Sequence, residues 1–438
     1  MTEIIEEASE LLSHPHDRAV IVSLEMPESE PGDLAEFCEL VTSAGVEIAT
    51  TITGSRQTAH HKYFVGTGKA EEICQAVQDY DANVILINHD LTPSQNRNLE
   101  SLCDIRVVDR TGLILDIFAQ RAQSFEGKLQ VELAQLTRLA TRLVRKHTNL
   151  SQQRGGAVGL RGPGETRLEM DRRVISDRIR QLKKRLESVT KMRAQERISR
   201  ERNEVPTVAL VGYTNAGKSS LFNALTDAGV YVQDQLFATL DPTHRAIEIP
   251  HVGRIVLVDT VGFISKLPHD LVEAFKSTLQ EAVEADLLLE VIDVADKERE
   301  LKMREVSNVL EQIKADQVPR LQVFNKIDLK PEINPHISEN ERGLPTAVWL
   351  SVVKKEGLSL LIDAIATHFQ QNHLALSVTL PPSEGRLRAE LYRLDAVKDE
   401  QFGEKGEFIL ELYLARYRLM RLLKEMPETS GYFTSVIS

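Results

Sequence analysis

One short segment constrains this chain more than any other: an eight-residue loop rich in glycine between an apolar strand and a helix. The run at 208–211 is typical of a buried strand, and 220–229 is typical of a helix. The loop follows the pattern GxxxxGK[ST], whose backbone N–H groups surround phosphate oxygens while the lysine reaches the β- and γ-phosphates. Its residues are Gly212, Tyr213, Thr214, Asn215, Ala216, Gly217, Lys218 and Ser219. We therefore expect a nucleoside triphosphate site, with the Ser219 hydroxyl as a Mg²⁺ ligand.

A second motif, Asp259-Thr260-Val261-Gly262, ends the apolar strand expected at 254–260. A carboxylate there can hold Mg²⁺ through water, and the Gly262 amide can contact a γ-phosphate. Ras-like enzymes place a glutamine next, which orients the attacking water. Here the next residue is Phe263, which cannot hydrogen-bond a water, so we expect slow intrinsic hydrolysis and leave the catalytic residue unassigned. Phe263 either retracts when a partner orders the site or simply packs in the core.

A third motif, Asn325-Lys326-Ile327-Asp328, closes the strand expected at 320–328. The Asp328 carboxylate can accept hydrogen bonds from guanine N1–H and the exocyclic amine, a donor pair that adenine lacks. The aliphatic stem of Lys326 can lie along the base, and Asn325 can brace the loop. Together with the first two motifs, this one favours GTP over ATP.

Two further segments complete the expected nucleotide site. The first is the run Phe237, Ala238, Thr239, Leu240 and Asp241. Thr239 is our choice for a second Mg²⁺ ligand, with Thr243 as the alternative. The second segment is Ser351, Val352 and Val353, whose backbone is placed to contact the base. Many GTPases carry alanine where this chain has Val352.

Strands and helices alternate on both sides of a long helical region. This alternation predicts two α/β units with mostly parallel sheets. Between them, leucines and isoleucines at helical spacing predict two long antiparallel helices, separated by a segment at 154–167 that contains six glycines or prolines. The boundaries we expect are an N-terminal α/β domain at 1–126, a basic hairpin at 127–203, a P-loop domain at 204–370 and a small C-terminal α+β domain at 371–438.

Charge is distributed unevenly along the chain. The net charge is −12, yet residues 138–202 contain 19 Lys and Arg against 7 Asp and Glu. A basic segment inside an acidic protein is either a nucleic-acid surface or a solvated helix face. The expected RNA-contact residues are arginines at or beside the glycine-rich segment: Arg154, Arg161, Arg167, Arg172 and Arg173.

The remaining composition points to the cytoplasm. The N-terminus is acidic, unlike a signal peptide, and no stretch approaches the length of a membrane span. The three cysteines, Cys38, Cys74 and Cys103, form no CxxC pair and are odd in number. We therefore expect no disulfide framework and a reducing compartment.

Taken together, these motifs resemble the HflX family, in the Obg–HflX branch of translation-factor-class GTPases. The resemblance extends beyond a generic P-loop domain to several longer segments. These are 64–69, 109–118, 126–136, the glycine-rich loop at 155–166 with 169 and 171–173, and FATLDPTHR at 237–245, where His244 departs from the family's threonine.

This resemblance implies a Mg²⁺-dependent GTPase that binds the large ribosomal subunit and splits stalled or stress-idled ribosomes. It supports Thr239 as the Mg²⁺-site threonine, and it implies that the hairpin reaches ribosomal RNA. A monomer is the default expectation. The family's N-terminal domain has been linked to ATP, but 66–69 lacks the spacing of a second P-loop.

Two alternative functions stay open. One is a regulatory GTP switch that binds a protein partner and no RNA. The other is an RNA-remodelling factor that uses ATP in its N-terminal domain. Ribonuclease sensitivity of the bound partner would separate the first from the ribosomal hypothesis, and ATPase activity of the first 200 residues would indicate the second.

Overall fold

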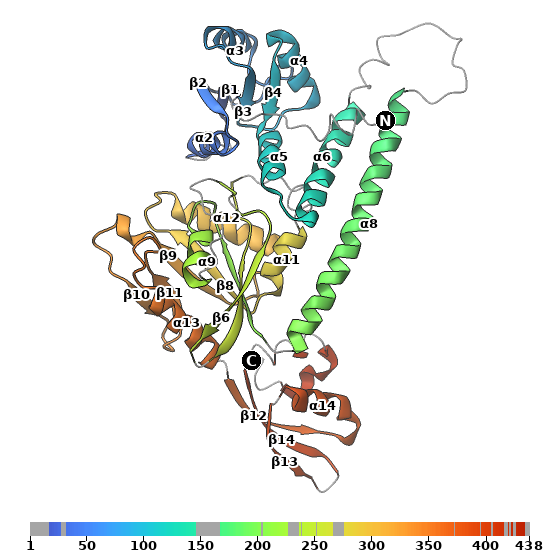
Figure 1. The fold of residues 1–438 in the computed structure, drawn as a ribbon, viewed down its shortest axis with the longest axis vertical. Coiled ribbons are helices and arrows are strands. Elements are labelled where there is room, and N and C mark those ends of the chain that lie inside the picture. The colour runs from blue at the N-terminus through green and yellow to red at the C-terminus, as the bar shows by residue number, and fades with distance from the viewer. Residues whose placement is uncertain are drawn as a thin grey trace.

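The computed structural model of this 438-residue chain shows four parts, and it confirms the predicted α/β fold class (Figure 1). They are an N-terminal part (17–121), a hairpin (125–202), a P-loop part (205–371) and a C-terminal part (373–433). The structure describes residues 17–27, 32–145, 167–202, 205–226, 236–237, 239–250, 252–265, 276–371, 373–394, 396–403, 406–415, 419, 422–423 and 426–433.

The N-terminal part is a four-stranded parallel sheet with helices on both faces. Its strand order is β2-β1-β3-β4, formed by β1 (Arg18–Glu25), β2 (Glu47–Ser55), β3 (Val84–Ile87) and β4 (Arg106–Asp109). Short apolar strands of this kind require cover on both sides. The face toward the P-loop part is covered by α2 (Asp33–Ser43) and α5 (Arg110–Arg121), and the opposite face by α3 (Thr67–Asp79) and α4 (Pro93–Cys103) (Figure 1).

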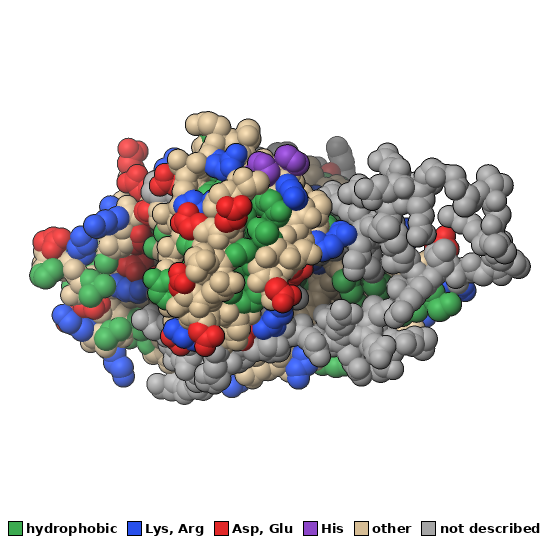
Figure 2. Space-filling model, turned by 90° about the horizontal axis from the view of Figure 1, so that it is seen from above, with side chains coloured by type: hydrophobic (Ala, Val, Ile, Leu, Met, Phe, Trp, Pro, Cys, Tyr) green, Lys and Arg blue, Asp and Glu red, His purple; other side chains and the backbone are tan. Residues whose placement is uncertain are grey.

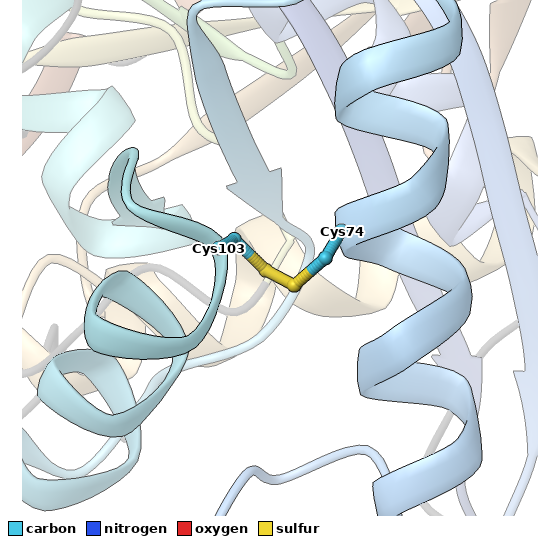
Figure 3. Close-up of a disulfide and its surroundings, with 2 residues drawn as sticks. All are labelled: Cys74 and Cys103. Carbon is cyan, nitrogen blue, oxygen red and sulfur yellow. A yellow bond between two sulfur atoms is a disulfide. The ribbon is translucent and has the colours of Figure 1, made fainter.

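A disulfide joins the two helices of the outer face, contrary to our expectation. Cys74 in α3 and Cys103 at the end of α4 are bonded, with their Cα atoms 4.9 Å apart (Figure 3). The expectation rested on cysteine number and spacing in the sequence. It was wrong because α3 and α4 lie side by side on one face of the sheet, which brings together residues 29 positions apart. Cys38 is free.

The hairpin consists of α6 (Phe125–Arg145) and the 36-residue α8 (Arg167–Arg202), which run side by side (Figure 1). The predicted apolar seam forms: Leu129 and Leu136 of α6 are buried against Ile175 and Leu182 of α8. An ion pair between Arg178 and Glu132, at 2.6 Å, lies beside the seam. Most of the glycine-rich segment, including Arg154 and Arg161, lies outside the described residues.

The P-loop part is a seven-stranded sheet in the order β10-β11-β9-β8-β5-β7-β6. Its strands are β5 (Thr207–Gly212), β6 (Thr243–Ile249), β7 (Gly253–Asp259), β8 (Leu287–Asp293), β9 (Arg320–Asn325), β10 (His336–Glu339) and β11 (Pro345–Trp349). All pairs are parallel except β6 with β7 and β10 with β11. One face packs on α9 (Lys218–Thr226) and α13 (Leu358–Gln371), and the other on α11 (Lys276–Glu284) and α12 (Arg299–Gln312). Strand β10 was not among the strands we expected.

The C-terminal part is a three-stranded antiparallel sheet in the order β12-β14-β13, and α14 packs on it. Its elements are β12 (His373–Leu380), α14 (Gly385–Arg393), β13 (Val397–Phe402) and β14 (Phe408–Ala415). None of the helices in the described ranges is both long and apolar enough to cross a bilayer.

A buried polar network joins the N-terminal part to the P-loop part. Glu36 of α2 accepts hydrogen bonds from Arg110 at the start of α5, from the Tyr213 hydroxyl, and from the Ser265 hydroxyl at 2.6 Å. Arg110 also donates to Asn88 at 2.7 Å. The Arg110 and Glu36 side chains are only 6% and 12% exposed. The loop that is expected to hold phosphate is therefore bonded directly to the neighbouring part.

Candidate nucleotide site

The P-loop lies where it is expected, between the carboxyl end of β5 and the start of α9, and two of its positions require glycine. Gly212 has φ +141°, and a Cβ there would lie 2.3 Å from the Val291 carbonyl oxygen. Gly217 has φ +96°, and a Cβ there would lie 2.3 Å from Asn325 Nδ2. Only glycine combines these backbone angles with such close neighbours.

Lys218 is buried at the base of this loop. Its Nζ donates to the Tyr213 carbonyl oxygen at 2.6 Å. Burial lowers the pKa of Lys218 to about 8, because a buried ammonium has lost its water. A Cβ on Gly262 would lie 2.9 Å from Nζ, so the two motifs are packed against each other. The lysine and the Gly262 backbone thus face the same small volume, where a phosphate would satisfy both.

Three oxygen-bearing side chains from three motifs meet beside the lysine. The Ser219 hydroxyl lies 2.7 Å from that of Thr239, and both donate to Asp259 Oδ2, at 2.7 and 2.9 Å. Burial raises the pKa of Asp259. Its other oxygen, Oδ1, is buried with no hydrogen-bond partner. Thr243, the alternative to Thr239, lies on β6, paired with Asp259 in the strand register.

This oxygen set fits Mg²⁺, which prefers oxygen ligands and usually keeps several waters. An orphaned buried carboxylate oxygen is costly unless a cation or water satisfies it. Among the described residues, no three His, Cys, Asp or Glu side chains gather around a possible metal position. A Mg²⁺ site here would therefore depend on the hydroxyls of Ser219 and Thr239.

Asn325 connects the P-loop to the loop after β11. Its Nδ2 donates to the Ala216 carbonyl oxygen at 3.0 Å, and its Oδ1 accepts from the Val352 amide at 3.1 Å. Asp328 accepts from the Ser351 hydroxyl at 2.5 Å. Lys326 pairs with Asp293 at 2.8 Å. The two loops expected to hold the base are thus fixed to each other and to the phosphate loop.

A cavity of about 400 Å³ runs between these groups. Its lining includes Lys218 and Thr239 at one end and Asp328 and Val353 at the other. Ser220 and Leu329 also line the cavity, although neither belongs to a motif identified in the sequence. Each directly follows a motif residue, Ser219 or Asp328, and that adjacency was the available signal.

Several residues that were expected in the site pack in the hydrophobic core instead of, or as well as, lining the cavity. Leu240 and Val261 are buried in the hydrophobic core shared with the N-terminal part. Phe237 lines the cavity and also packs edge-on against Phe118 of α5, with ring centroids 4.7 Å apart. Ile327 is buried. Ala238 lies outside the described residues.

Phe263 packs in the core of the protein alone, a position that both readings share. It is 1% exposed and lies in the cluster that contains Val258 and Leu279. Its backbone bonds to the P-loop strand: the Thr214 amide donates to its carbonyl at 2.8 Å, and its own amide donates to Gly212 at 3.1 Å.

The expected RNA-contact residues are only partly described. Arg172 and Arg173 are exposed in the first turns of α8, and Arg167 begins that helix. The other two lie in the glycine-rich segment outside the description.

A phosphate loop at the carboxyl edge of a parallel sheet, a DxxG motif beside it and an NKxD loop at the far end of one cavity together define a P-loop GTPase. Comparison with known proteins agrees. The sequence matches three families, described as "GTP-binding GTPase N-terminal" over 32–119, "GTP-binding GTPase Middle Region" over 121–200 and "50S ribosome-binding GTPase" over 207–326.

Two relatives identify the family within the class of P-loop GTPases. The GTPase HflX of Escherichia coli strain K12 is 52% identical over 417 residues, covering 95% of this chain and 98% of that protein. The GTPase HflX of Caldanaerobacter subterraneus subsp. tengcongensis is 45% identical over 397 residues, covering 91% of each. This chain belongs to the HflX family of GTPases, and it is an enzyme that hydrolyses GTP.

Among solved structures, the crystal structure of the SsGBP and GDP complex is 28% identical to this chain. The match covers 81% of this chain and 99% of the chain in that structure, with a TM-score of 0.47. A GTP-binding protein from Sulfolobus solfataricus in complex with GDP is 26% identical, covering 80% and 97%, with a TM-score of 0.44.

Proposed function

We propose that this enzyme binds Mg²⁺·GTP in the cavity, with Ser219 and Thr239 as direct Mg²⁺ ligands and Asp259 acting through water. The observation that carries the assignment is the orphaned Asp259 oxygen beside two hydroxyls. Bound there, Mg²⁺ would neutralise charge that develops on the phosphates. Lys218 and the Gly262 amide hold the terminal phosphates, and Asp328 selects guanine through its paired acceptors.

Base selectivity tests the Asp328 assignment. Inosine triphosphate lacks the exocyclic amine of guanine, so the native protein should prefer GTP over ITP. Asp328→Asn should lower that preference by about tenfold or more, because the exocyclic amine of the bound guanine would lose its hydrogen bond to a charged carboxylate. Asp363→Asn, an exposed change on α13, is the control. Unchanged preference for GTP in Asp328→Asn would remove the assignment.

We further propose that the enzyme binds the large ribosomal subunit and separates stalled or idle ribosomes, in the cytoplasm and as a monomer. Two observations support the ribosomal partner. The family matched by residues 207–326 is described as a 50S ribosome-binding GTPase. Helix α8 carries 13 Lys and Arg against 6 Asp and Glu, and its 36 residues correspond to about 54 Å.

The basic face of α8 is a better candidate for RNA than the outer end of the N-terminal part. Exposed cations of α8 include Arg180, Lys183, Lys184, Arg185 and Lys191. Figure 2 looks onto the end of the molecule formed by the N-terminal part, where positive and negative side chains are interspersed. Phosphate contacts dominate RNA affinity, so the helix with the excess of positive charge is the one that RNA would attract.

GTP hydrolysis measured with and without purified large ribosomal subunits, at two salt concentrations, tests this proposal. We expect strong stimulation that falls as salt rises. Replacing Lys183, Lys184 and Arg185 by Gln should reduce both the stimulation and its salt dependence. The control replaces three exposed cations elsewhere, Lys314, Arg386 and Lys398. Absence of stimulation, with GTP binding intact, would instead favour a regulatory switch with a protein partner.

A further inference from the structure

Asp241, two residues after Thr239, does not face the nucleotide cavity. Its carboxylate accepts hydrogen bonds from the backbone amides of Gln123 and Ser124, at 2.9 and 2.7 Å, and from the Ser124 hydroxyl at 2.5 Å. Ser124 immediately precedes α6, and its hydroxyl accepts from the Gly127 amide at 2.8 Å. The Asp241 side chain of the P-loop part therefore binds the backbone directly before the first hairpin helix, α6.

Gly127 in α6 makes this approach possible. A Cβ at this position would lie 2.3 Å from Asp241 Oδ1 and 3.1 Å from Ser124 Oγ. Glycine is a poorer helix former than alanine, so the helix itself gives no reason for glycine here. Its local reason is the space that the Asp241 carboxylate occupies.

The other end of the same segment, before Thr239, is attached to the N-terminal part. The Leu236 amide donates to the Ser43 hydroxyl at 3.0 Å, and Phe237 packs on Phe118. Thr239 lies between these two attachments, with its hydroxyl at the oxygen cluster. The residues that surround Thr239 are thus held from outside the P-loop part on both sides.

We propose that Asp241 is a positioning residue for the reaction: by binding the start of α6, it holds Thr239 at the Mg²⁺ site. The inference rests on the proposed role of Thr239 as a Mg²⁺ ligand and extends it to the hairpin. GTP, whose Mg²⁺ would hold Thr239, then favours the seated position of α6. By linkage, displacement of α6 weakens binding of GTP by the same factor.

Gly127→Ala is the most informative variant. The substitution lies in α6, outside the P-loop part, yet its methyl group displaces the Asp241 carboxylate. Its matched control is Gly68→Ala in α3, where a Cβ would meet nothing within 4 Å. We expect Gly127→Ala and Asp241→Ala each to weaken binding of a non-hydrolysable GTP analogue by about tenfold, equivalent to ~1.4 kcal/mol. Affinity for GDP should change less than about twofold, and Gly68→Ala should match the native protein for both nucleotides.

Hydrogen exchange provides a readout that does not depend on activity. The Gln123 and Ser124 amides, which donate to Asp241, should exchange more slowly with the GTP analogue bound than with GDP. This difference should vanish in Asp241→Ala. Equal exchange of these amides in both nucleotide states of the native protein would overturn the proposal.

Thr239→Ala separates this inference from the proposed function. If Thr239→Ala loses GTP affinity and Gly127→Ala does not, the anchor is refuted while the Mg²⁺ assignment stands. If neither variant changes the ratio of GTP to GDP affinity, the Mg²⁺ assignment of Thr239 fails as well, and the coupling fails with it.

Discussion

Three glycines of the nucleotide site are fixed by three different neighbours. Gly212 is adjacent to the Val291 carbonyl, Gly217 to the Asn325 side chain and Gly262 to Lys218 Nζ. The motif pattern predicted these glycines and the residues that surround phosphate. It did not reveal that Asn325 touches both the P-loop and Val352, because those contacts join residues 109 and 27 positions apart. Local spacing carries no information about them.

At the residue scale, His368 of α13 makes stability sensitive to acid. Burial lowers its pKa to about 4, so the folded protein keeps it neutral while the unfolded chain takes up a proton below about pH 6.5. Stability is therefore lost as pH falls from about 6.5 toward 4, by about 2 kcal/mol between pH 7 and 5.

Denaturant unfolding at pH 7 and pH 5 measures this effect. His368→Gln should lose less stability on acidification than the native protein by about that amount. His336→Gln, at an exposed position in β10, serves as the control and should follow the native protein. An equal acid-induced loss in His368→Gln would contradict the assignment.

At the element scale, helices and strands were largely predictable, whereas contacts between them were not. Apolar runs located the buried strands, and apolar residues at helical spacing located α6 and α8. Strand β10 escaped because only Ile337 of its four residues is apolar. The Cys74–Cys103 bond escaped because it depends on which helices share a face of the sheet.

That disulfide should contribute measurably to the stability of the N-terminal part. A cross-link between positions 29 residues apart stabilises by about 3–4 kcal/mol in the chain-entropy description. Reduction, or Cys74→Ser with Cys103→Ser, should therefore lower the melting temperature, and a reductant should then have no further effect. Cys38→Ser is the control and should keep the reductant response. A melting temperature indifferent to reductant would contradict the cross-link.

At the scale of the whole molecule, the interface between the N-terminal and P-loop parts combines a shared hydrophobic core with the buried charge pair of Glu36 and Arg110. The sequence predicted both parts but gave no sign that Glu36 and Arg110 meet Tyr213 and Ser265. Glu36 and Arg110 are 74 residues apart in the sequence. They can pair only because α2 and α5 lie together on the same face of the sheet.

Arg110→Met should be strongly destabilising because it leaves the Glu36 carboxylate buried and uncompensated. We expect a loss of about 3–5 kcal/mol, much of it recovered in the double variant with Glu36→Gln. The control, Arg106→Met, breaks the pair with Asp17 at the other end of the sheet, where Arg106 is 43% exposed and Asp17 keeps a hydrogen bond from Asn83. Calorimetry should show the N-terminal part unfolding separately in Arg110→Met. A single cooperative transition at the native temperature would disprove this role.

The hydrogen-bond network around Arg110 also reaches the place where a sheet of this order would bind a ligand. Parallel sheets take ligands at the crevice where the strand order reverses, outside the carboxyl ends of the strands. In the order β2-β1-β3-β4 this crevice lies between β1 and β3, where Asn88 bonds to Ser23 and Arg110. Arg110 in turn bonds to Ser265 of the P-loop part. A small molecule that bound in that crevice would share Arg110 with Ser265, so its binding would act directly on the interface between the N-terminal part and the P-loop part.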